Sequence, residues 1–352
     1  MEKIGIFSPY LDTASGGERY VGTIAECLSN KGYSVDLFWH DKTIKKKLTN
    51  FLRMDLDNVT INNELGGVSF SIIGIFRKWR ITKNYKVFFF LSDGSVPLLF
   101  SKNNFLLFQN PFPKITPNIS NKIKLMLYKK IVCNSHFTKS FVDKQYGVRS
   151  IVIFPPVDID RFIPLEKNNT ILNVGRFVWN KKQDILIDTF KQMCDSGLKN
   201  WNLILTGSTF GKNTDYFNRL KEMSTGYPIK VIKNPSFDLL TRLYGISKIY
   251  WHATGFGENI RVHPEYTEHF GIATVEAMSA GNVPVVINLG GQPEIVKDED
   301  CGYLWNNINE LKSKTLLLIN APGKLKSMSI KAKERSRLYS KQTFYKNLIK
   351  II

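Results

Sequence analysis

The stretch TEHFGIATVEAMSAGNVPVVI, residues 267–287, places a loop, a helix and a buried strand in succession. Gly271 marks the turn at the end of the loop, and Gly281 is placed to end the helix that follows. The apolar run 283–287 is typical of a strand covered on both faces, as the strands of parallel sheets are. A strand reached through a helix in this way predicts a βαβ unit.

Alternation of strands and helices runs along the whole chain and occurs as two series. The first predicts helices over 18–30 and 137–146 and strands over 3–7, 34–39, 86–91, 105–109, 131–134 and 151–154. The second predicts strands over 171–174, 202–206, 230–233, 249–252, 283–287 and 302–305. A segment of prolines and polar residues, 155–169, separates the two series. The sequence therefore predicts an α/β fold of two doubly wound parallel-sheet domains, 1–165 and 166–340, with ligands bound beyond the carboxyl ends of the strands.

The composition excludes several classes of protein. Of 352 residues, 43% are hydrophobic and 22% are charged, which indicates a folded chain of about two domains and not a disordered one. The four cysteines stand far apart without a C-x-x-C pair, so the sequence predicts neither a disulfide framework nor a zinc site, and a cytoplasmic location is expected. The first residues resemble a strand and not a signal peptide, and no run of about 18 apolar residues predicts a membrane-spanning helix.

The chain is strongly basic, with 49 Lys and Arg against 30 Asp and Glu and a formal charge of +19. Such a surface attracts phosphates, nucleic acid or anionic lipid without distinguishing among them. Basic residues gather at 42–47, 77–86, 122–130 and 324–350. Because Phe76, Trp79 and Tyr85 accompany the second cluster, its composition suits an anionic membrane surface. A solubilising surface explains the same residues equally well.

The turn at Gly271 predicts a binding site for an anion. The amides of Gly271, Ile272 and Ala273 precede the first hydrogen bonds within the helix, and the helix dipole adds positive charge there. Glu268 and Glu276 flank this turn with seven residues between them. Because a phosphate repels a carboxylate, the expected partner of each glutamate is a neutral diol, which the carboxylate holds by accepting two hydroxyl hydrogen bonds.

This segment resembles the E-x7-E signature of retaining glycosyltransferases of family 4, within the glycosyl transferases group 1. The resemblance implies the GT-B architecture, in which two Rossmann-like domains face each other across a cleft. It also implies that Glu276 binds the ribose of a nucleotide-sugar donor and that Glu268 acts catalytically at the donor sugar. Phe270 and the amides of residues 271–273 are expected to contact the donor as well. The segments 277–286 and 290–296 are similar to the continuation of the family pattern.

A pair of cationic residues follows the first strand of the second series. Arg176 and Lys181, five residues apart, can converge on one diphosphate at the start of a helix. The resemblance gives both residues a catalytic role, the neutralisation of the leaving nucleoside diphosphate, and Lys182 takes the place of Lys181 if the loop is shifted by one residue.

Two further segments are expected to contact the donor. Gly16 and Gly17 open the first helix and allow a close backbone approach, and together with Ser15 they resemble the glycine-rich loop that faces the donor in the family. Asn234 stands where relatives receive the base, mainly through backbone contacts. His252 and His263 are assigned no role, because a lone histidine in a loop is usually structural.

The resemblance implies a retaining hexosyltransferase that moves a sugar from a nucleoside-diphosphate sugar to a lipid-linked saccharide or another glycan. The first domain is expected to bind the acceptor and the second the donor, while 341–352 forms a helix that packs back on the first. Arg176, Lys181 and a helix terminus already supply positive charge to the diphosphate, so neither a metal ion nor another cofactor is expected. Peripheral contact with the cytoplasmic face of an anionic membrane fits a lipid-linked acceptor.

Two other functions remain open at this point. A sugar-nucleotide epimerase of similar architecture has the same phosphate and ribose contacts but forms product without an acceptor. A nucleic-acid-binding protein explains the charge of +19 and predicts salt-sensitive binding that does not depend on Glu268 or Glu276. The sequence contains no recognised nucleic-acid-binding motif, so binding of nucleic acid is not expected.

Overall fold

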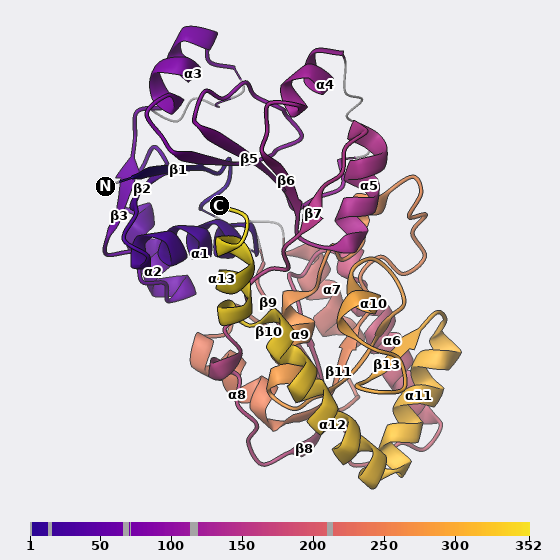
Figure 1. Cartoon of the computed structure of the whole chain (residues 1–352). Helices are drawn as coiled ribbons and strands as arrows, with labels where there is room; N and C mark the ends of the chain where they lie inside the picture. The colour runs from indigo at the N-terminus through magenta and orange to yellow at the C-terminus, as the bar shows by residue number, and fades with distance from the viewer. Residues whose placement is uncertain (1, 13–15, 66–69, 71, 113–118, 210–213) are drawn as a thin grey trace. The chain divides into compact units, whose positions relative to one another are not determined.

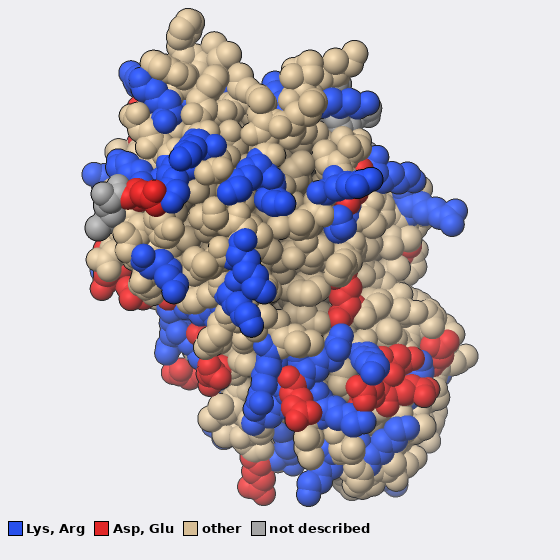
Figure 2. Space-filling view, viewed as in Figure 1, with Lys and Arg blue, Asp and Glu red and all other residues tan. Residues whose placement is uncertain are grey.

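The computed structural model describes residues 2–12, 16–65, 70, 72–112, 119–209 and 214–352 (Figure 1). The chain divides into two units, the first comprising Met1–Pro156 with Lys341–Ile352 and the second Val157–Ser340. Lys and Arg side chains cover more of the face seen in Figure 2 than Asp and Glu do, as the formal charge of +19 leads one to expect.

The first unit is built on a parallel sheet of seven strands in the order β3-β2-β1-β4-β5-β6-β7. Its strands are β1 (Lys3–Phe7), β2 (Ser34–Phe38), β3 (Val59–Asn62), β4 (Val87–Leu91), β5 (Asn103–Phe108), β6 (Lys130–Cys133) and β7 (Ile151–Val152). Its helices are α1 (Gly16–Asn30), α2 (Ile44–Leu52), α3 (Ile75–Thr82), α4 (Ile119–Leu125), α5 (His136–Tyr146) and α13 (Lys341–Ile349).

Both faces of this sheet are buried, which explains the apolar character of its central strands. Along β4, Val87 and Phe89 join the core beneath α1 and α13, whereas Phe88 and Phe90 join the core beneath α3, α4 and α5. Figure 1 shows these two groups of helices on opposite faces of the sheet. This is the doubly wound arrangement, with β1 at the point where the strand order reverses.

The second unit repeats the plan with six parallel strands in the order β10-β9-β8-β11-β12-β13. Its strands are β8 (Asn168–Val174), β9 (Asn202–Gly207), β10 (Ile229–Lys233), β11 (Ser247–His252), β12 (Val283–Ile287) and β13 (Tyr303–Trp305). Its helices are α6 (Gln183–Asp195), α7 (Asp215–Met223), α8 (Phe237–Ile246), α9 (Ile272–Ser279), α10 (Gln292–Ile295), α11 (Ile308–Asn320) and α12 (Pro322–Ser336). The prediction of two doubly wound parallel-sheet units is confirmed.

The boundary between the units lies at Pro156 and not at residue 165, where the sequence analysis placed it. The segment after Pro156 is tied to the second unit, because the ring of Phe162 packs edge-on against Tyr244 with centroids 5.2 Å apart. In addition, the Leu165 N–H donates to the Gly245 carbonyl at 3.0 Å. This segment is therefore not a free linker, although it is rich in prolines and polar residues.

The last helix, α13, belongs to the first unit. Phe344 is buried with its ring edge against Tyr20 of α1, at a centroid distance of 5.0 Å. Lys341 Nζ lies 2.6 Å from Glu26 Oε2 on the same helix, and this carboxylate is buried. The first unit is thus assembled from both ends of the printed sequence.

Candidate active site

Charged side chains gather where the strand order of the second sheet reverses. The neighbouring strands β8 and β11 lie side by side at that point, and the carboxyl ends of parallel strands meet at one edge of a sheet. Arg176 follows β8, and Lys181 ends the short 3-10 helix η2 (Trp179–Lys181). His252 is the last residue of β11, and the loop after it carries Glu268 to the start of α9.

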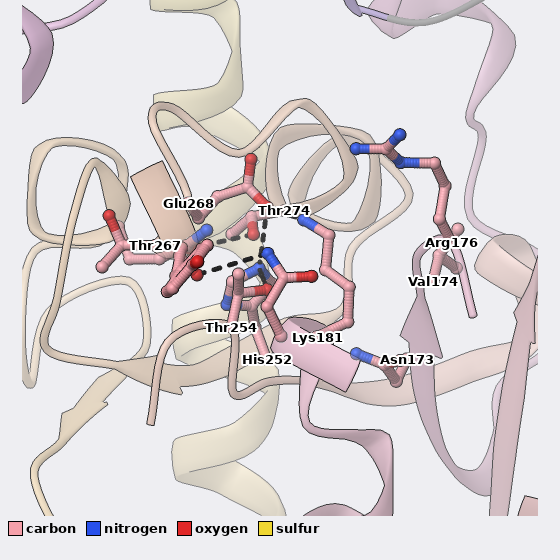
Figure 3. Close-up of polar contacts among 12 residues, drawn as sticks. Asn173, Val174, Arg176, Lys181, His252, Thr254, Thr267, Glu268 and Thr274 are labelled. Atoms are coloured by element: carbon pink, nitrogen blue, oxygen red, sulfur yellow. Dashed lines mark hydrogen bonds and ion pairs between the residues drawn. The ribbon is translucent and has the colours of Figure 1, made fainter. Parts of the chain in front are cut away.

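Glu268 is the centre of this cluster (Figure 3). Its Oε2 lies 2.7 Å from Lys181 Nζ and 3.2 Å from His252 Nε2, and Thr254 Oγ1 lies 3.0 Å from the same imidazole nitrogen. An ionised carboxylate can only accept hydrogen bonds, so the proton of a neutral His252 must sit on Nε2. His252, to which no role was assigned from the sequence, therefore joins the cluster, and its position at the end of a predicted strand is the sequence feature that pointed there.

The electrostatic surroundings keep Glu268 ionised. Burial raises the pKa of Glu268, but the adjacent ammonium of Lys181 and the hydrogen bond from His252 outweigh this effect and hold the pKa well below its usual range. Burial also lowers the pKa of His252, although Glu268 partly opposes the shift. At neutral pH the cluster therefore consists of a carboxylate, an ammonium and a neutral imidazole.

Two glycines hold the backbone that carries Glu268. The Gly291 N–H donates to the Glu268 carbonyl at 2.7 Å. A Cβ atom on Gly290, whose φ is +64°, would lie 2.2 Å from that same carbonyl oxygen, and one on Gly291 would lie 2.6 Å from the His269 carbonyl oxygen. This close approach of two backbone segments requires glycine at both positions.

The start of α9 has the geometry that an anion site needs. Gly271 adopts a φ of 122°, and its carbonyl accepts hydrogen bonds from the Thr274 and Val275 amides at 3.0 and 3.3 Å. The amides of residues 271–273 therefore precede the helix's own hydrogen bonds, and Ile272 and Ala273 are partly exposed. Phe270 is buried with its ring against Tyr339, so the structure does not present its side chain to a ligand.

Glu276 is positioned by a neighbouring helix. It lies one turn into α9, is 5% exposed, and accepts a hydrogen bond from the Tyr244 hydroxyl of α8 at 3.0 Å. The hydroxyl of Tyr244 thus helps to orient this carboxylate.

The remaining predicted residues lie farther from Glu268. Arg176 is exposed and projects from the end of β8 toward the side on which Lys181 meets Glu268 (Figure 3). Lys182 Nζ lies 2.6 Å from Glu258 Oε1, so Lys181 and not Lys182 approaches Glu268. Asn234 follows the edge strand β10, where its Oδ1 accepts from the Thr209 amide at 3.2 Å, and the structure does not bring its side chain to the cluster.

Gly16 and Gly17 open α1 in the first unit, and Ser15 before them lies outside the described residues. Among the residues that the structure describes, no group of three or more His, Cys, Asp or Glu side chains is arranged to hold a metal ion. Over the same residues, no helix has both the length and the apolar character needed to cross a bilayer.

Comparison with known proteins identifies the family. Residues 158–335 match the model of the family described as glycosyl transferases group 1. The match covers half of the chain and includes the whole cluster around Glu268. The chain belongs to this family, as the resemblance implied.

Two curated relatives and one solved structure illustrate the similarity. A GDP-Man:Man(3)GlcNAc(2)-PP-Dol alpha-1,2-mannosyltransferase of Dictyostelium discoideum is 26% identical over 262 residues, which cover 70% of this chain and 50% of that protein. A GDP-mannose:cellobiosyl-diphosphopolyprenol alpha-mannosyltransferase of Komagataeibacter xylinus is 29% identical over 205 residues, which cover 56% of this chain and 47% of that protein. The chain thus spans about half the length of these relatives.

A glycosyltransferase structure from Rickettsia africae matches with a TM-score of 0.78 at 18% identity, covering 99% of this chain and 97% of that one. This likeness concerns the fold, and it confirms the GT-B class.

Proposed function

We propose that the chain is a retaining, metal-independent hexosyltransferase of family 4 that moves a sugar from a nucleoside-diphosphate sugar to a lipid-linked saccharide. The observation that carries this proposal is the Lys181–Glu268–His252 cluster beside the amides that open α9. The cation and the helix terminus can hold a diphosphate. The ionised carboxylate in the same site can accept hydrogen bonds from sugar hydroxyls.

The donor is proposed to be GDP-mannose. Both relatives described above are named as using GDP-mannose, with acceptors attached through a diphosphate to dolichol or to a polyprenol. In this chain Glu276 would accept hydrogen bonds from the ribose hydroxyls. Asn234 would add a contact to the donor, mainly through the backbone.

The reaction proposed for this site breaks the bond between the anomeric carbon and the phosphate oxygen, and the electron pair goes to that oxygen. Arg176, Lys181 and the amides of residues 271–273 stabilise the negative charge that develops there. The acceptor hydroxyl forms its new bond on the same face of the sugar, which retains the configuration, and its proton passes to the departing phosphate. Because these groups supply the positive charge, the step does not depend on a divalent ion.

A thermal-shift experiment with nucleotide sugars tests the donor site. In the presence of EDTA, GDP-mannose is expected to raise Tm by several degrees. Each kcal/mol of binding free energy raises Tm by about 2–4 °C for a domain of roughly 150–250 residues, the size range of the second unit. UDP- and ADP-sugars are expected to give smaller shifts. In Glu276→Ala the shift should disappear relative to that variant's own Tm without ligand, whereas Glu222→Ala, an exposed glutamate on α7, should keep it.

Several outcomes would contradict this proposal. A shift that needs Mg²⁺ or Mn²⁺ would overturn metal independence, and a shift retained in Glu276→Ala would overturn the ribose role. Conversion of the donor sugar to an epimer without acceptor would favour the epimerase.

A further inference from the structure

The first unit contains a cavity that is separate from the cluster around Glu268. Its volume is about 440 Å³, and its walls come from the turn 93–97 after β4 and from helices α3 and α4. The strand β4 neighbours β1, where the strand order of the first sheet reverses. Open α/β sheets bind their ligands at such a point, so the cavity lies where a ligand is expected in this unit.

Two lysines from different helices converge on this cavity. Lys78 of α3 and Lys124 of α4 both line it, and each side chain is partly buried. Lys78 and Lys124 line the same cavity, and burial together with the charge of Lys124 lowers the pKa of Lys78. Bringing two cations together in a partly desolvated place costs free energy, and a bound anion offsets this cost.

Other polar side chains also line the cavity. Asp93 is the carboxylate among the described lining residues, and its Oδ1 accepts from the amide of Ser95 at 3.1 Å and from its hydroxyl at 2.6 Å. These bonds shape the turn after β4. Asn121 of α4 adds an amide side chain. Among the lining residues that the structure describes, two lysines stand against one carboxylate, so these side chains carry a net positive charge.

The helices that supply the lysines also expose large apolar side chains. Phe76 of α3 is 85% exposed, and Met126, directly after α4, is 84% exposed. The other exposed apolar side chains of these two helices are Ile75, Trp79, Ile119 and Ile123. Exposed apolar side chains grouped in this way mark an interaction surface.

Cations accompany these apolar side chains. Lys83 Nζ lies 3.5 Å from the centroid of the Trp79 ring, and Lys122 is exposed on α4. In Figure 2 the upper ends of the first unit, over α3 and α4, are tan with blue side chains beside them. Apolar side chains bordered by Lys and Arg are the combination that binds an anionic bilayer.

We propose that the cavity between α3 and α4 binds the phosphate groups of a lipid-linked acceptor while the apolar side chains of the same two helices enter the membrane beside it. This rests on the proposed function, which calls for an acceptor of that kind. A lipid whose chain lies in the bilayer presents its diphosphate at the membrane surface. Lys78 and Lys124 stand on the helices that would touch that surface, so they are placed to receive it.

Vesicle sedimentation tests this proposal. Phosphatidylcholine vesicles carrying either a polyprenyl diphosphate or phosphatidylglycerol, at equal surface charge, are compared. Wild type is expected to bind the polyprenyl diphosphate vesicles more tightly. The double variant Lys78→Gln/Lys124→Gln should lose about tenfold or more of that binding, because each charge-assisted hydrogen bond contributes substantially to affinity. Its binding to phosphatidylglycerol should change by less than about threefold.

Control variants separate the contributions. Lys122→Gln, an exposed lysine on α4 that does not line the cavity, should lower binding to both vesicles slightly and equally. Phe76→Ser/Met126→Ser should weaken binding to every vesicle. The double lysine variant should keep the Tm shift caused by GDP-mannose, since its substitutions lie in the first unit and the donor cluster in the second.

Two results would overturn the proposal. Equal losses on both kinds of vesicle would show general attraction to a membrane and no site for a diphosphate. Equally strong binding of inorganic diphosphate in solution, abolished by the same double variant, would show a site for free phosphates and not for a lipid. If instead no nucleotide sugar binds the wild type while the vesicle preference holds, the proposed donor function fails and the acceptor site stands.

Discussion

Replacing Lys181 by Met is expected to lower kcat/KM for sugar transfer by about 10²–10³-fold. This is the cost that removal of one electrostatic stabiliser of a developing oxyanion typically has. The variant loses the cation that we assign to the departing phosphate, and it leaves the partly buried carboxylate of Glu268 without the ammonium 2.7 Å away. The measurement is the steady-state rate of transfer with saturating acceptor.

Lys182→Met is the matched control. Lys182 is the next residue, its side chain is 18% exposed against 17% for Lys181, and it also pairs with a glutamate, Glu258. Its loss should reduce kcat/KM by less than about tenfold, in line with the modest value of ion pairs that are not aimed at the reacting atoms. Similar losses in the two variants would contradict the role of Lys181.

The same variant should alter the pH dependence of the rate. In the wild type, Lys181 and His252 outweigh burial and keep the pKa of Glu268 low, so the carboxylate remains ionised at moderately acidic pH. Without Lys181, burial is opposed mainly by His252, and the pKa of Glu268 rises. The acidic limb of the pH–rate profile should therefore move to higher pH in Lys181→Met and stay in place in Lys182→Met.

Gly290→Ala is expected to lower both stability and activity strongly. The added Cβ would lie 2.2 Å from the Glu268 carbonyl oxygen, and backbone on both sides limits relaxation. We expect a loss of about 1–3 kcal/mol from overpacking in addition to about 1–2 kcal/mol for a positive φ. Displacing Glu268 by an ångström should also reduce the rate about 100-fold.

Gly147→Ala separates these two costs. Gly147 has a φ of +65°, nearly that of Gly290, but a Cβ there meets no atom within 4 Å. The free energy of unfolding of this variant should fall only by the cost of the positive φ, and the variant should keep full activity. Urea denaturation followed by tryptophan fluorescence, together with the transfer rate, gives both quantities. A Gly290→Ala variant as stable and active as Gly147→Ala would show that the approach of Gly290 does not position Glu268.

The sequence predicted the fold well because parallel strands are buried on both faces and therefore appear as continuous apolar runs. The strand β12, VPVVI, is completely buried, and its prediction was confirmed. The strand β3, VTIN, was missed because it is four residues long and alternates between buried and more exposed positions. Because this strand lies at the edge of the sheet, it lacks the continuous apolar run by which the central strands are recognised.

The structure brings together two of the predicted site residues, Glu268 and Lys181, which are 87 positions apart in the chain. The sequence favoured Lys181 and kept Lys182 as the alternative. The choice follows from the backbone, because Lys182 adopts a left-handed conformation with a φ of 56° and its side chain reaches Glu258. His252 was not assigned because its distance to Glu268 depends on the path of a 15-residue loop, which tertiary contacts determine.

The position of α13 has a consequence for how the protein is made. A ribosome releases residues 2–156 first, yet Tyr20 and the buried carboxylate of Glu26 meet Phe344 and Lys341 only when the final residues of this sequence emerge. The second unit, 157–340, is contiguous and can fold during synthesis as it emerges. The first unit therefore cannot complete its packing until the second unit has been synthesised, and until then the surface of α1 that α13 covers stays open to chaperones.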